Sequence, residues 1–96
     1  PLAPEGVKHA WHLYVIRVDA KRRDEFRTRL TLLGVGTQVH YPPAYRHPIF
    51  EGRFTGIDAD AELASLENIS LPIFPAMTDR DVKRVADCFK KAVAGR

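Results

Sequence analysis

The run from Trp11 to Val18 limits the choice of folds more than any other stretch of the sequence. It reads Trp-His-Leu-Tyr-Val-Ile-Arg-Val, so most of its residues are β-branched, aromatic or aliphatic. Near-continuous apolar runs of this length are typical of strands covered on both faces, rather than of strands with one face in solvent. We therefore predict a central strand over 11–18 that is covered on both faces.

A helix is predicted over 22–33. Phe26, Leu30 and Leu33 recur at i, i+4 and i+7 and therefore lie on one side of it. Gly34 is suited to the C-terminal cap, because glycine adopts the left-handed conformation there without strain.

The last helix begins after Thr78, a favourable N-cap residue. Asp79 and Asp81 stand in its first turn, where the helix dipole favours negative charge. Its predicted apolar stripe comprises Val82, Val85, Ala86, Phe89 and Val93.

Shorter elements complete the chain: a strand over 35–39, a helix over 58–67 and a strand over 69–71. The predicted order is β-α-β-loop-α-β-α. For 96 residues this order indicates one domain of the α/β (α+β) class. We expect a small two-layer or three-layer-like sandwich, in which helices pack on a short sheet.

Residues 40–57 follow no helical or alternating pattern and are rich in proline, glycine and aromatic residues. A loop this long in a compact domain tends to be functional. Its prolines stiffen the backbone, and a tyrosine before proline favours a cis bond. Polar groups on such a loop suit an anionic or sugar-like ligand, although the aromatic residues are equally compatible with simple packing of the loop. The candidate binding residues are His40, Tyr41, Arg46 and His47.

Several other kinds of site are disfavoured. There is no glycine-rich loop between a strand and a helix, so Rossmann and P-loop sites are excluded. His9 and His12 lack a third metal ligand, and their spacing in an extended segment sends them to opposite faces. Cys88 is better explained as a partly buried helix residue than as a nucleophile.

The charges exclude some partners. A net charge of +3 is spread along the chain rather than clustered, and no aromatic RNA-binding strand is present, so we expect no nucleic acid partner. No apolar run approaches the ~20 residues of a membrane span. The first residues lack the features of a signal peptide, so the cytoplasm is the simplest location.

Four sequence blocks occur in the order found in a known family. They are His9–Arg17; Arg23–Phe26 with Leu33-Gly34; Gly34–Pro43, which contains Thr37 and His40-Tyr41-Pro42; and Ser70-Leu71-Pro72-Ile73-Phe74-Pro75 followed by Thr78–Val82. In these blocks the chain resembles the C-terminal domain of the DegT/DnrJ/StrS family of sugar aminotransferases, which use pyridoxal phosphate.

The resemblance implies the small domain of a fold-type-I enzyme. Residues 1–10 would be a linker from a missing N-terminal large domain, and 11–96 the aminotransferase C-terminal small domain. In this family the large domain holds pyridoxal phosphate and the lysine that forms its Schiff base. The fragment alone is therefore expected to bind no cofactor, to contain no catalytic residue and to be inactive. The intact enzyme is expected to be a homodimer.

The resemblance also implies a reaction. Intact relatives transfer an amino group, usually from glutamate, to a keto sugar linked to a nucleotide, in polysaccharide or antibiotic sugar biosynthesis. His40 and Tyr41 would line the sugar-nucleotide end of the site, with Arg46 and His47 as further phosphate contacts. Some members of the fold are dehydratases instead. The alternative is a free-standing α/β module that binds a sugar phosphate or a protein partner, and an exposed apolar patch would argue against it.

Overall fold

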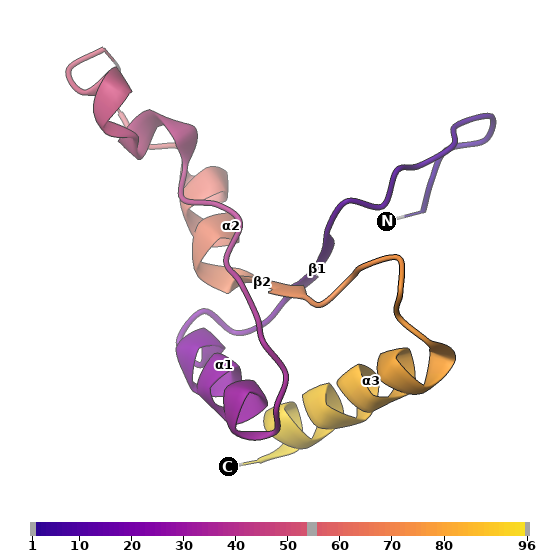
Figure 1. Cartoon of the computed structure of the whole chain (residues 1–96). Coiled ribbons are helices and arrows are strands. Elements are labelled where there is room, and N and C mark those ends of the chain that lie inside the picture. The colour runs from indigo at the N-terminus through magenta and orange to yellow at the C-terminus, as the bar shows by residue number, and fades with distance from the viewer. Residues whose placement is uncertain (1, 54–55, 96) are drawn as a thin grey trace.

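The computed structural model describes residues 2–53 and 56–95 (Figure 1). The fold is α+β, as expected, and within these residues three α-helices accompany a two-stranded sheet. In chain order the elements are β1 (Tyr14–Arg17), α1 (Arg23–Leu32), the 3-10 turns η1 (Ala44–Arg46) and η2 (Pro48–Phe50), α2 (Ala59–Glu67), β2 (Asn68–Leu71) and α3 (Asp79–Ala94). Residues 2–13 form an arm without helix or strand.

The strands β1 and β2 are antiparallel, and their register pairs Tyr14 with Leu71 and Val15 with Ser70. A single bridge on the other edge of β2 joins Ser70 to Gln38, with N–O distances of 3.2 and 2.8 Å. The strand predicted over 35–39 is thus reduced to this one bridge, because only Gln38 pairs. As a result β2, and not β1, occupies the middle of the sheet.

The predicted central strand over 11–18 was therefore wrong in both length and place. Within the described residues β1 has one hydrogen-bonded neighbour, and Tyr14 and Val15 are 56% and 44% exposed. The buried strand is β2, in which Asn68, Ile69 and Ser70 are all buried. A continuous apolar run predicts that the strand is buried on both faces. It does not predict whether the residues that bury it belong to the same segment of polypeptide.

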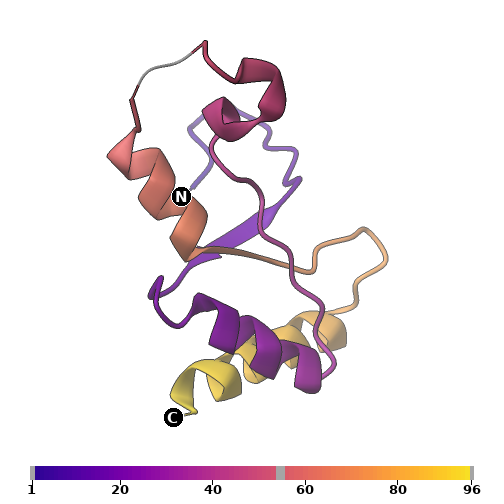
Figure 2. The same ribbon diagram turned by 90° about the vertical axis from the view of Figure 1, so that its left-hand side faces the viewer.

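Helices lie on two sides of the strands. In both views α1 and α3 lie on one side and α2 on the opposite side (Figures 1 and 2). The core between α1 and α3 consists of Leu30, Val35, Cys88 and Ala92, with Leu71, Val85 and Phe89 packed against it.

The predicted apolar stripe on α3 is only partly buried, since Val82, Ala86 and Val93 are exposed. Cys88 is confirmed as a buried helix residue.

Both helix ends that the sequence predicted have the expected caps. Gly34 has φ of 82°, and the Val35 and Gly34 N–H groups donate to Leu30 O and Thr31 O at 2.9 and 3.0 Å. This is a Schellman motif, which glycine adopts without strain. At the start of α3, Thr78 and Asp81 form a reciprocal capping box.

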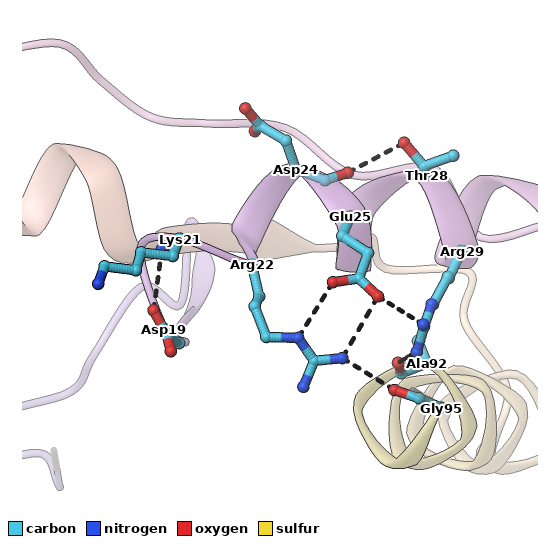
Figure 3. A network of polar contacts seen from close by, with 9 residues as sticks. All are labelled: Asp19, Lys21, Arg22, Asp24, Glu25, Thr28, Arg29, Ala92 and Gly95. Carbon is cyan, nitrogen blue, oxygen red and sulfur yellow. Dashed lines mark hydrogen bonds and ion pairs between the residues drawn. The ribbon is translucent and has the colours of Figure 1, made fainter.

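Two arginines, the N-cap residue Arg22 of α1 and Arg29 within α1, close the other end of α3 (Figure 3). Arg22 donates to Gly95 O at 2.8 Å, and Arg29 donates to Ala92 O at 3.0 Å. Glu25 pairs with both guanidinium groups and holds them in place. The pKa of the Glu25 carboxyl is lowered, chiefly by its hydrogen bond to Arg22. The two helices are thus joined by polar contacts as well as by the core.

Candidate functional site

The His40–Tyr41 turn lies beside the middle of β2. The bridge between Gln38 and Ser70 holds the preceding residues against the strand, which brings the His40 ring to Ser70. His40 Nδ1 lies 2.8 Å from the hydroxyl oxygen of Ser70. His40 is partly buried and Ser70 is only 5% exposed, so the histidine is anchored from inside the domain.

Tyr41 presents its side chain outward from the same turn. It is 64% exposed, and its ring meets the His40 ring edge to face, with centroids 4.7 Å apart. The cis peptide bond of this segment joins His40 to Tyr41, one bond earlier than the Tyr-Pro bond that the sequence suggested.

This turn faces away from α1 and α3. Side chains alternate between the two faces of a strand, so Ser70 points to the face opposite that of Ile69 and Leu71. Leu71 packs on the core between α1 and α3. Ser70 and the His40 ring that it contacts therefore lie on the sheet face that those two helices leave uncovered, where Val15 is also exposed.

A second cluster ties the loop to α2. Tyr45 Oη and Arg46 Nε both donate to Glu62 Oε1 at 2.7 Å. Hydrogen bonds from Arg46 and then Tyr45 lower the pKa of the Glu62 carboxyl. Desolvation, together with the bond to Glu62, raises the pKa of Tyr45. Arg46 is thus paired with a carboxylate, while His47 accepts from the Ile49 N–H at 3.3 Å and caps the start of η2.

The four predicted residues fall into two groups. His40 and Tyr41 form one, and Arg46 and His47 lie around η1 and η2, at the end of the molecule opposite α1 and α3 (Figures 1 and 2). Within residues 2–53 and 56–95, no hydrogen bond or ring contact joins the groups. Sequence reasoning assigned no role to Ser70 or Glu62. Ser70 stands in the Ser-Leu-Pro block, and that position was the available signal.

An apolar groove of about 370 Å³ opens on the other face of the sheet. It lies between the strands and the part of α3 from Val82 to Lys90. Its lining includes Tyr14, Ile16, Leu71, Val82 and Phe89.

The lysines of this chain do not fit a pyridoxal phosphate site. Lys8, Lys21, Lys83, Lys90 and Lys91 are all exposed. Lys83 donates to Asp87 at 2.6 Å, and this hydrogen bond raises the pKa of its ammonium group. A lysine that forms an imine needs desolvation and a lowered pKa instead.

The described part of the chain contains no group of three His, Cys, Asp or Glu side chains suited to a metal ion. The His9 ring stacks on Trp11. None of the helices described is both long and apolar enough to cross a membrane. The cytoplasmic location remains a prediction.

Comparison with known proteins gives consistent matches. Residues 1–90 match the DegT/DnrJ/EryC1/StrS aminotransferase family. The chain is 39% identical to an uncharacterized protein of Methanocaldococcus jannaschii over 98% of its length, and 35% identical to the spore coat polysaccharide biosynthesis protein SpsC of Bacillus subtilis over 99%. It spans 26% of the length of each relative.

The fold is shared by solved structures, among them TlmJ and NtdA. The aminotransferase TlmJ from Streptoalloteichus hindustanus superposes with a TM-score of 0.87 at 31% identity, covering 98% of this chain and 25% of TlmJ. NtdA from Bacillus subtilis, solved with bound cofactor PMP, gives a TM-score of 0.78 at 27% identity, covering 91% of this chain and 21% of NtdA.

Proposed function

The chain belongs to the DegT/DnrJ/EryC1/StrS aminotransferase family, and from this premise we propose that it is the C-terminal small domain of a pyridoxal-phosphate-dependent sugar aminotransferase. Residues 11–96 form this domain, and 1–10 are the linker from an N-terminal large domain. The intact enzyme is a homodimer. The large domain holds the cofactor, which supplies the electron sink for amino transfer, and this chain alone is inactive.

The apolar surfaces support the domain assignment over a free-standing module. Tyr14 and Val15 on β1 are exposed, and Val82, which lines the groove, is 54% exposed. Phe74 is 52% exposed. Burial of such surface is worth roughly 25 cal/mol per Å², so a chain that functions alone gains nothing from leaving it open. The match to about a quarter of each relative agrees with this proposal.

We propose that the intact protein transfers an amino group from glutamate to a keto sugar linked to a nucleotide. The observation that carries this proposal is the anchored turn: His40 is held by the buried Ser70 hydroxyl, beside the exposed hydroxyl-bearing ring of Tyr41. An imidazole N–H and a phenol hydroxyl on a fixed backbone suit the oxygens of a sugar or a phosphate. Arg46 and His47 are secondary phosphate contacts in this proposal.

The test uses the full-length protein with pyridoxal phosphate. Glutamate should convert the cofactor to its amino form, which absorbance follows, and a keto sugar nucleotide should restore it. His40→Ala should lower kcat/KM for the sugar nucleotide by about 10-fold or more, the loss of one or two hydrogen bonds. His12→Ala, an exposed histidine on the arm, is the matched control.

Two outcomes would contradict the proposal. An enzyme that accepts glutamate but no sugar nucleotide would refute the substrate class. Loss of water from the sugar without any requirement for glutamate would identify a dehydratase. If the wild type uses the sugar nucleotide and His40→Ala has the same kcat/KM for it, His40 is not part of the site, and the proposed reaction still holds.

A further inference from the structure

We infer that Ser70 is a positioning residue that fixes the tautomer of His40, with the ring proton on Nε2. In this state His40 donates a hydrogen bond to an oxygen of the substrate. The inference rests on the proposed function, because it assumes that the His40 turn meets a sugar or phosphate oxygen.

The hydrogen-bond inventory of Ser70 indicates the direction of the bond. A neutral imidazole has one N–H donor and one bare nitrogen acceptor, so either group could donate across the 2.8 Å between Ser70 Oγ and His40 Nδ1. The backbone N–H and C=O of Ser70 are already used by Gln38. Among the described residues, His40 is the only hydrogen-bond partner of the Ser70 hydroxyl.

Burial then selects one arrangement. Ser70 is 5% exposed, so a hydroxyl proton directed away from Nδ1 would be left without an acceptor in the interior. Donation from Oγ–H to Nδ1 satisfies the hydroxyl and leaves the His40 proton on Nε2. Within the part of the chain that the structure describes, Nε2 makes no hydrogen bond.

The surrounding backbone makes this arrangement stiff. Ser70 lies on the middle strand, between β1 and the Gln38 bridge, so its hydroxyl projects from the most constrained segment of the sheet. The edge contact with Tyr41 restrains the other side of the His40 ring. Fixing a donor before the substrate arrives reduces the entropy lost on binding.

The kinetic test compares variants of the full-length enzyme in the two half-reactions. Ser70→Ala should lower kcat/KM for the keto sugar nucleotide roughly 5- to 10-fold, the effect of one misdirected hydrogen bond, and lower the glutamate half-reaction much less. Ser70→Thr, which keeps the hydroxyl, should restore most of the loss. Ser65→Ala, a partly buried serine on α2, is the matched control.

A double variant separates positioning from a structural effect. If Ser70 acts through His40, Ser70→Ala should have no further effect in a His40→Ala background. Equal losses in both half-reactions, or full additivity with His40→Ala, would overturn the inference and leave the proposed function standing.

The tautomer is also measured without turnover. In full-length protein labelled with ¹⁵N-histidine, the His40 resonances should show the proton on Nε2, and Ser70→Ala should remove this preference. A proton on Nδ1 in the wild-type protein would overturn the inference, whatever the substrate proves to be. Failure of the wild type to aminate any sugar nucleotide would instead refute the proposed function.

Discussion

Replacing Leu30 by alanine tests whether α1, the segment after it and α3 share one core. Leu30 has no exposed surface, and it packs in one cluster with Val35, Cys88 and Ala92, all nine-tenths or more buried. The Schellman cap ties Val35 to the Leu30 carbonyl, so the neighbours have little freedom to collapse into the space left. Leu→Ala changes at such sites cost about 2–5 kcal/mol, and we expect about 3 kcal/mol or more here.

The control lies two residues away. Leu32 is on the same helix but 82% exposed, so Leu32→Ala makes the same chemical change without a cavity and should stay within about 0.5 kcal/mol of wild type. Urea unfolding of the 96-residue chain, followed by circular dichroism at the helix band, measures both. The free energy of unfolding should fall by about 1–1.5 kcal/mol per M urea, so the urea midpoint of Leu30→Ala should lie about 2–3 M below that of wild type.

A milder variant keeps the comparison possible if the chain is weakly stable. Leu30→Val should lose only about 1 kcal/mol and give a measurable midpoint between those of wild type and Leu30→Ala. Equal midpoints for Leu30→Ala and Leu32→Ala would refute the reasoning, because they would mean that α1 does not bury Leu30 against α3.

Three further predictions concern polar contacts. Thr78→Ala should destabilise the chain by about 1 kcal/mol in the same urea assay, because it removes the N-cap of α3. Hydrogen bonds from Thr78 lower the pKa of the Asp81 carboxyl. The ionised carboxyl therefore stabilises the folded chain above the ordinary carboxyl pKa, and this stabilisation is lost as the pH falls through the lowered pKa. In Asp81→Asn, the urea midpoint of unfolding should fall less steeply with decreasing pH below about pH 4. Glu62→Gln should speed tryptic cleavage after Arg46, which loses its ion pair, whereas the exposed Glu51→Gln should not; equal rates would contradict the role of Glu62.

Features governed by neighbours in sequence were the most predictable. Gly34 and Thr78 act on backbone groups within a few residues, so residue type and spacing were enough to place both caps. The apolar period of α1 likewise placed Phe26 and Leu30 on one side, and both are buried. Leu33, the third residue of that period, is the C-cap residue and is 36% exposed. Each of these predictions needed only local geometry.

Features set by distant contacts were less predictable. The sequence placed the central strand at 11–18, but pairing makes β2 the middle of the sheet, and a strand's position among its neighbours is not encoded in its own pattern. The bond between His40 and Ser70 spans 30 positions in the chain. Residue type identified His40 as a candidate. Its contact with Ser70 depends on the pairing of Gln38 with β2, which the local sequence pattern does not predict.

The arginines of α1 have a consequence for local opening of the domain. The final turn of a helix normally frays first, since its carbonyls lack partners within the helix. Here Ala92 of α3 instead accepts from Arg29 of α1, and Gly95, which follows α3, accepts from Arg22, the N-cap residue of α1 (Figure 3). The end of α3 therefore opens only when α1 releases it, so amide protons in the last turn of α3 should exchange with solvent together with those of α1 rather than ahead of them.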